Sequence, residues 1–297
     1  MPPYELHVSH VTNFVHQHLE GLQELYDQIP TSTGFHELGK KFMISMLHVM
    51  HAIVKLNQDK SRDPVEIINK ARSLDQELDE IKALLPLAWH PKRVRLDIPS
   101  DHYYGNMYSI CLHPVITQMW NYTRFLGIQV HEIIRVNLMR AYEEHASPRF
   151  DAVSLKACIQ REEDVLRANV AAIIAAVPQT TGMIPSPTHP FAAETTSEGE
   201  TKGENIMRDP GTFISSVVSP RLMQLIQPLY AVGTCVLITH GMRQWIIKIL
   251  HFVALRIGSR QAVVLAAELQ GLQEPASSVA LDREDIAEWM ALDPGVI

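Results

Sequence analysis

The stretch from Ile116 to Leu138, ITQMWNYTRFLGIQVHEIIRVNL, decides the fold. Its apolar side chains recur every three or four residues, which is the spacing of one face of an α-helix. The residues on that face are Ile116, Met119, Leu126, Val130, Ile133 and Leu138. The pattern predicts a long central helix that packs against its neighbours along this face.

The rest of the chain also has helical spacing, and it shows no alternating strand pattern of convincing length. Helices are predicted at 7–28, 35–58, 64–85, 151–177, 220–240, 242–257 and 259–271, with a short one running from a cap at Asp282 through Trp289. A chain of 297 residues can bury a large helical core. We therefore predict an all-α protein, an irregular bundle of about nine helices forming a single domain over residues 1–297.

The predicted helix over residues 64–85 has the clearest start and end. Asp63 can cap its N-terminus, Pro64 occupies the first helical position, and Glu66 completes the spacing of a capping box. Pro86 ends it, because proline cannot continue a helix.

Residues 182–212 differ in composition from everything around them. Pro, Ser, Thr, Gly and Glu dominate, and Phe191 is the single aromatic residue. Such a segment buries too little apolar surface to offset its ordering entropy, so we expect a disordered loop inserted in the domain. Ser186-Pro187 is a candidate site for proline-directed phosphorylation, although a tolerated surface insertion explains the segment as well.

Charge and cysteine content narrow the functional classes. The formal net charge is −7, and an acidic surface repels phosphate backbones, so no direct contact with nucleic acid is expected. Cys111, Cys158 and Cys235 lie far apart, which fits a reducing compartment and no disulfide framework. The first residues carry neither a basic start nor an uninterrupted apolar run, so we expect no secretory signal.

Three segments together resemble a known family. They are Tyr104-Gly105-Asn106-Met107-Tyr108, then Met119-Trp120-Asn121-Tyr122-Thr123-Arg124, and Val130-His131-Glu132-Ile133-Ile134. They are similar to the middle of the regulatory domain that follows the zinc cluster in fungal Zn(II)2Cys6 transcription factors, where a helix opens near a Tyr and carries a Trp-Asn-x-x-Arg core. Further similarity lies in Ala176-Val177-Pro178, which closes a helix in this pattern, and in the run from Pro228 to Gly258.

The resemblance implies a helical domain that modulates transcription in the nucleus. By this resemblance the chain contacts other proteins, among them a second copy of itself, and responds to a small-molecule effector. The family's zinc cluster needs six closely spaced cysteines and this sequence has 3, so the DNA-binding element is absent from it. The alternative is a free-standing helical adaptor or dimerisation protein in the cytoplasm, unrelated to transcription.

Trp120, Asn121 and Arg124 are the only site residues that the resemblance singles out. One interpretation places them in the lining of a ligand or interface groove. The other, which we favour, is structural: Trp120 packs the bundle while Asn121 and Arg124 make internal hydrogen bonds.

No motif predicts an enzyme, a cofactor or a metal. Gly34–Lys41 nearly matches a phosphate-binding loop, but it lacks the final hydroxyl residue and the preceding strand. The 15 histidines form no set of converging ligands, and His131-Glu132 lacks a second histidine four residues on. The acidic run Glu162-Glu163-Asp164 is interpreted as a solvated helix face that pairs with Arg161 and Arg167.

The segment from Leu222 to Met242 contains no Asp, Glu, Lys or Arg and is long enough to cross a bilayer. Gln224, Gln227, Pro228 and Gly233 interrupt its apolar character. We therefore interpret it as a buried helix and expect no membrane span.

Overall fold

The computed structural model describes residues 35–58, 63–95, 103–143, 152–183 and 218–272. Seven α-helices, one short 3₁₀ helix and one pair of strands lie within these ranges. In chain order they are α2 (Phe35–Gln58), α3 (Pro64–Ala83), η1 (Leu87–Trp89), β1 (Lys92–Arg95), β2 (Met107–Ile110), α4 (Pro114–Glu143), α5 (Ala152–Thr180), α6 (Val218–Thr234), α7 (His240–Ile257) and α8 (Arg260–Gly271). The mostly all-α class predicted from the sequence is confirmed for these residues.

The two strands correct the prediction locally. Although the sequence shows no strand pattern of convincing length, Lys92–Arg95 forms β1 and pairs antiparallel with β2, so that Val94 faces Tyr108 in the register. The helix expected near Tyr104 begins only at Pro114. Four-residue strands are too short to show an alternating pattern, which is why the sequence does not reveal them.

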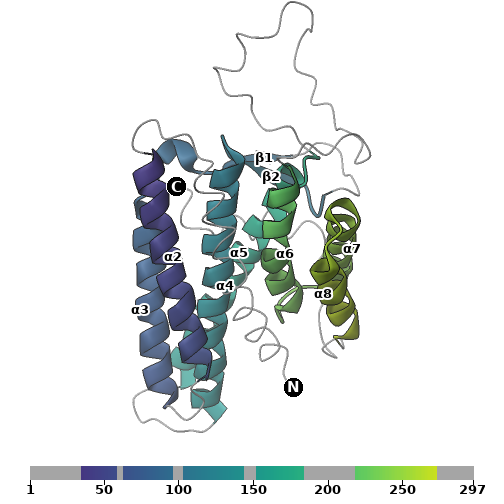
Figure 1. The fold of residues 1–297 in the computed structure, drawn as a ribbon. Coiled ribbons are helices and arrows are strands. Elements are labelled where there is room, and N and C mark those ends of the chain that lie inside the picture. Colours follow the sequence, from purple (N-terminus) through teal and green to yellow (C-terminus); the bar gives the residue numbers. More distant parts are fainter. Residues whose placement is uncertain (1–34, 59–62, 96–102, 144–151, 184–217, 273–297) are drawn as a thin grey trace, which may run out of the picture.

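The helices gather around two apolar cores, and α4 and α5 take part in both (Figure 1). The first, here called the α3–α4 core, draws its buried side chains mainly from α2, α3 and α4. The second, the α6–α8 core, draws on α5, α6, α7 and α8. Figure 1 shows the order across the molecule, from α2 and α3 at one side through α4, α5 and α6 to α7 and α8 at the other.

The cap predicted for α3 is present. Asp63 accepts a hydrogen bond through Oδ1 from the backbone N–H of Val65, 3.3 Å away, and Pro64 opens the helix. The first turn of α2 follows Gly34 directly, and Gly39 to Lys41 lie inside that helix. The stretch that resembles a phosphate-binding loop is therefore helical from Phe35 onward.

Pro178 does not close α5, contrary to expectation. The helix continues to Thr180, and Gly182 ends the segment with a positive φ of 76°. Proline removes one backbone donor, but the next turn is reinforced because the Thr181 N–H and hydroxyl both donate to the carbonyl of Val177, each at 2.9 Å.

The apolar run at 222–242 is not a single helix. Helix α6 ends at Thr234, and α7 starts at His240, with Thr239 as its N-cap. Among the described residues, no helix is both long enough and apolar enough to span a membrane.

Several predictions lie outside the described residues. They are the helix at 7–28, the short helix after Asp282, and the loop at 182–212 apart from Gly182 and Met183. The predicted total of about nine helices therefore compares with seven in the part of the chain that is described.

Candidate functional site

The middle of α4 is buried on all sides. Every residue from Ile116 to His131 is buried, and several of them are polar. The buried polar residues in this span are Thr117, Gln118, Asn121, Thr123, Arg124, Gln129 and His131. A helix surrounded in this way needs partners for each polar group, because burying an unpaired one costs about 1–3 kcal/mol. These partners define the candidate site.

Trp120 joins α4 to the short helix η1. Its indole Nε1–H donates to the carbonyl of Trp89 at 2.8 Å, and its ring meets the His90 ring edge-on at a centroid distance of 5.1 Å. The guanidinium of Arg124 lies 5.5 Å from the centre of the Trp120 ring. Such a cation–π contact offsets part of the cost of burying the arginine.

Arg124 also joins α4 to α5. Its Nη1 donates to the backbone carbonyl of Ala172 at 3.2 Å. The small residues around Ala172 and the absence of a side chain at Gly127 let the two helices approach closely: a Cβ added at Gly127 would lie 3.2 Å from Nδ2 of Asn169. The contacts of Trp120 and Arg124 are those of a helix junction.

Asn121 differs from its two neighbours. Its side chain is buried, but within the part of the chain that the structure describes its Oδ1 atom has no hydrogen-bond partner. The structure thus brings Trp120 and Arg124 together. Asn121 lies on the adjacent face of α4, which is also the face of Ile128, two helical turns further along the chain.

Gln179 fastens the end of α5 to the beginning of α4. Its Oε1 accepts from the Cys111 N–H at 2.9 Å and from the Thr117 hydroxyl at 3.0 Å. Its Nε2 donates to the Cys111 carbonyl at 2.7 Å. One buried amide therefore satisfies three polar groups where β2 leads into α4.

His131 bridges three helices. Its Nε2 lies 3.1 Å from Oδ1 of Asp75 on α3, and its Nδ1 lies 2.6 Å from Oε2 of Glu162 on α5. Although burial lowers the pKa of His131, the hydrogen bonds to Asp75 and Glu162 and their negative charges raise it to about 9. The imidazole is therefore a cation at neutral pH.

The partner Asp75 is shifted in the opposite direction. Burial raises its pKa, but the hydrogen bond and charge of His131, with the more distant Lys82 and Arg161, hold the pKa below its ordinary value. Because both ring nitrogens of His131 are occupied, the imidazole has no lone pair for a metal or a substrate proton. This geometry is that of a charged clamp between helices.

The Tyr104 segment contacts the other core. The Tyr104 hydroxyl lies 3.1 Å from Oγ1 of Thr239, which in turn accepts from the Met242 N–H at 3.1 Å and so caps α7. The Tyr104 ring also packs against Trp245 at a centroid distance of 5.9 Å. Each of the three family-like segments therefore contributes a buried contact between elements distant in sequence.

A second set of buried amides lies on α6. In the described part of the chain, Oε1 of Gln224 and both Oε1 and Nε2 of Gln227 have no hydrogen-bond partner. Gln227 is completely buried. With Oδ1 of Asn121 they make up four unpaired carboxamide atoms on α4 and α6, two helices that pack against each other.

Two of the three cysteines, Cys111 and Cys235, have buried thiols that are not activated as nucleophiles. Burial raises the pKa of Cys111, and burial with the charge of Glu132 raises that of Cys235 to about 12. A thiolate is the reactive form, so both groups are inert at neutral pH. No group of three or more His, Cys, Asp and Glu side chains within the described ranges is arranged to hold a metal ion.

The sequence interpretation misplaced Glu162. Glu163 and Asp164 do pair with Arg167, at 3.2 and 2.9 Å, but Glu162 is buried against His131. The missed signal is its spacing: Glu162 lies seven residues after the buried Leu155 and four before the buried Leu166. It therefore falls on the apolar face of α5.

Comparison with known proteins supplies no relative. No protein-family model, curated protein or solved structure matches the chain.

Proposed function

We propose that this chain is a regulatory-type helical domain that modulates transcription through effector response and contacts with other proteins. The proposal rests on the resemblance of three segments, centred on Tyr104, Trp120 and His131, to the regulatory domain of fungal Zn(II)2Cys6 factors. The partners of the chain are proteins, including a second copy of itself, and the six closely spaced cysteines of the family's DNA-binding element do not occur in this sequence. The chain acts in the nucleus.

The placement of the family-like core is the observation that supports this proposal best. Trp120 and Arg124 lie where α4 meets η1 and α5, and Tyr104 contacts α7. Residues that hold a junction of helices can transmit a change in one helix to the others. The mechanism we propose is a population shift, in which an effector binds one arrangement of the helices better than another.

Exposed apolar side chains on α7 and α8 provide a surface that partner proteins can contact. Leu255 of α7 is 87% exposed, and Val263 and Val264 of α8 are also exposed. Helices α7 and α8 form one side of the molecule in Figure 1. The net charge of −7 favours proteins over nucleic acid as the direct partner.

The test is to tether the chain to a heterologous DNA-binding domain and to measure reporter transcription under several growth conditions. We expect output that differs from that of the DNA-binding domain alone and that changes with conditions. A fusion carrying Leu126→Asp, which places a charge in the α3–α4 core, should lose the effect, whereas Gln76→Ala on an exposed surface should keep it.

Output equal to that of the DNA-binding domain alone under every condition contradicts the proposal. If the purified chain then proved to be a stable dimer by light scattering, the free-standing adaptor would be the better description.

A further inference from the structure

We infer that the outer face of α7 is a docking site for residues 282–293 of this same chain. The face, here called the α7 stripe, consists of Lys248, His251, Phe252, Leu255 and Arg256. Its occupant, here called the acidic segment, lies outside the described residues and is identified by its sequence, DREDIAEWMALD. The inference goes beyond the proposed function and does not depend on it.

The α7 stripe lies on one side of a single helix. Its members follow Lys248 by three, four, seven and eight positions, and side chains with this spacing are neighbours on a helix surface. One contact within the stripe is direct, because the guanidinium of Arg256 lies 5.2 Å from the centre of the Phe252 ring. Ile246 and Leu250, on the opposite side of α7, are completely buried.

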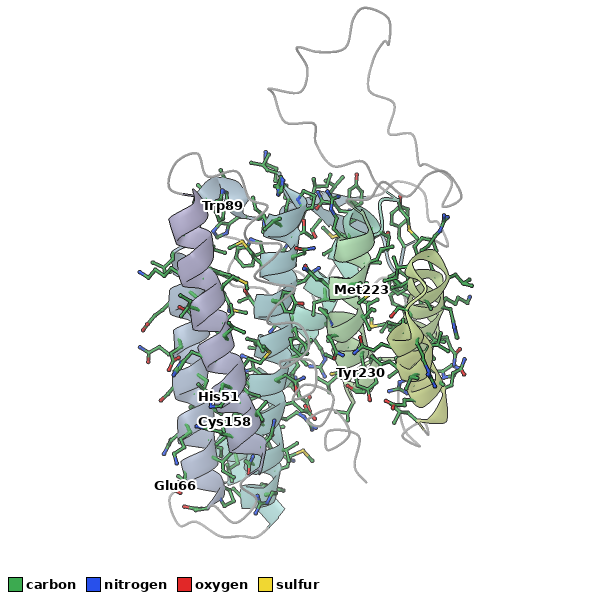
Figure 2. All side chains as sticks on the ribbon, viewed as in Figure 1. His51, Glu66, Trp89, Cys158, Met223 and Tyr230 are labelled. Carbon is green, nitrogen blue, oxygen red and sulfur yellow. The ribbon has the colours of Figure 1, made fainter. Side chains whose placement is uncertain are left out.

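The stripe combines apolar surface with positive charge. Leu255 is 87% exposed, and Lys248 and His251 on the preceding turns are exposed as well. Within the residues that the structure describes, no carboxylate forms an ion pair with Lys248 or Arg256. In Figure 2, side chains project from α7 and α8 on the side of the molecule away from the labelled Met223 and Tyr230 of α6.

The helices around the stripe carry an excess of positive charge, although the net charge of the chain is −7. Between Val218 and Leu272 the single carboxylate is Glu268, which accepts a hydrogen bond from the Tyr230 hydroxyl at 2.9 Å. The five cations of this stretch are Arg221, Arg243, Lys248, Arg256 and Arg260. Such a surface attracts a negatively charged partner.

The acidic segment has the complementary composition. It contains five carboxylates and one cation, Arg283. Its apolar residues Ile286, Trp289 and Met290 have the spacing of one helical face, in line with the short helix predicted to begin at Asp282. An amphipathic helix of this kind can bury its apolar face against Leu255 and Phe252 while its carboxylates meet the cations at either side.

The segment is attached within reach of the stripe. Asp282 comes ten positions after Leu272, and an extended chain of that length spans up to about 33 Å. Helix α8 has 12 residues, so its two ends lie about 18 Å apart. Its first residue, Arg260, comes four positions after Arg256 of the stripe. The connecting residues can therefore return the segment along α8 to α7.

This connection favours the acidic segment over a separate acidic protein as the occupant. A short linker gives the tethered segment an effective concentration on the order of millimolar at the stripe, so that a weak affinity is enough. A partner protein would have to displace the segment in order to reach Leu255.

The first experiment cross-links the purified full chain with a carbodiimide, which joins a lysine amine directly to a carboxylate. Lys248 is the single lysine between Val218 and Leu272, and the acidic segment contains none. The internal control is Lys70, an exposed lysine on α3. Mass spectrometry of an equal mixture of ¹⁴N- and ¹⁵N-labelled protein separates links within one chain from links between two chains.

We expect a link within one chain from Lys248 to a carboxylate of the acidic segment, and no such link from Lys70. The docking is overturned if Lys248 forms no such link, if Lys70 forms it equally, or if the links join two chains exclusively.

The second experiment measures amide hydrogen exchange of the acidic segment by mass spectrometry. The test variant is Lys248→Glu/Arg256→Glu, and the matched control is Lys70→Glu/Arg72→Glu, at exposed residues of α3. The test variant should exchange at least about fivefold faster than the wild type, because like charges then face each other, and the control should not. Adding Asp285→Lys/Glu288→Lys to the test variant should restore the slow exchange.

Circular dichroism checks that each variant folds, and Leu255→Ser repeats the test if the double substitution does not. Equal exchange in the test and control variants overturns the docking. Neither experiment depends on transcription, so a cross-linked segment with a silent reporter contradicts the proposed function and leaves the docking site intact.

Discussion

His131 is a cation held between two carboxylates on different helices, and its energetic contribution depends on pH. The hydrogen bonds to Asp75 and Glu162 favour the protonated imidazole, which raises its pKa from 6.5 to about 9 in the folded protein. A group whose pKa rises on folding stabilises the protein fully below its unfolded pKa. That stabilisation is lost as the pH rises through the folded pKa.

We therefore predict that the free energy of unfolding of the wild type falls between pH 6.5 and pH 9 by about 3 kcal/mol at most. The variant His131→Gln should be less stable at neutral pH and should lack this fall. Urea denaturation followed by circular dichroism across this pH range measures both effects.

The matched control is His48→Gln. His48 lies 3.2 Å from Glu77, but the two side chains are 70% and 42% exposed, so solvent screens the pair. This variant should keep the wild-type pH profile. An unchanged profile in His131→Gln would contradict the buried-clamp interpretation.

Gln179 is a second residue with a large predicted effect. The variant Gln179→Leu leaves the N–H and carbonyl of Cys111 and the Thr117 hydroxyl without their partner. We expect a loss of about 2–4 kcal/mol in the free energy of unfolding, because the groups stay buried. The exposed substitution Gln76→Leu should change it by less than about 0.5 kcal/mol, and similar losses in the two variants would show that the three bonds contribute little.

At the scale of single residues, the sequence predicts which positions are buried and which residue caps a helix, but it does not predict which residues contact each other. The helical face of α4 and the cap at Asp63 follow from local spacing. Which helix receives Trp120, Arg124 or His131 depends on contacts between residues distant in the chain, and local spacing carries no information about them. The spacing of Glu162 relative to Leu166 predicts that Glu162 is buried. The adjacent charged residues Glu163 and Asp164 favoured the incorrect interpretation that it is exposed.

At the scale of elements, the close approach of α6 and α8 depends on Gly233. A Cβ added at this glycine would lie 2.5 Å from Cδ1 and 2.8 Å from Cδ2 of Leu269, which is itself buried. A methyl group at this position therefore requires the buried leucine to change its rotamer or the two helices to move apart.

We predict that Gly233→Ala lowers the free energy of unfolding by about 1–3 kcal/mol, despite the better helix propensity of alanine. Gly271→Ala is the control, because a Cβ there meets nothing within 4 Å. Thermal or urea denaturation of the two variants makes the comparison. Equal stability of both variants would mean that α8 adjusts freely.

Element boundaries show where local patterns fail. Pro178 predicted the end of α5, yet the helix extends to Thr180 because threonine hydroxyls and the Gln179 amide stabilise the last turn. The apolar run at 222–242 predicted one helix, yet it breaks after Thr234, where Thr239 caps the next helix. In both cases side-chain hydrogen bonds decide the boundary, and composition does not reveal them.

At the scale of the whole molecule, two cores share α4 and α5. Leu155 of α5 lies in the α3–α4 core, whereas Leu166 and later residues of the same helix lie in the α6–α8 core. A helix that crosses both cores couples their unfolding, since neither can lose its packing without exposing part of α5.

We predict one cooperative unfolding transition. In the double variant Trp245→Phe/Trp289→Phe, fluorescence reports on the two remaining tryptophans, Trp89 and Trp120 in the α3–α4 core, while far-UV circular dichroism reports on all helices. The urea midpoints from the two signals should coincide. Two separate midpoints would show that the cores unfold independently.

The rate at which the buried thiols are alkylated measures how often the structure opens around them. Cys111 and Cys235 have raised pKa values and almost no exposed surface, whereas Cys158 is partly accessible. An alkylating reagent should consequently mark Cys158 early and reach the other two only when the chain opens around them. Because Cys235 follows the last turn of α6, the rate at which it is labelled reports how often that helix parts from its neighbours, with no probe attached beforehand.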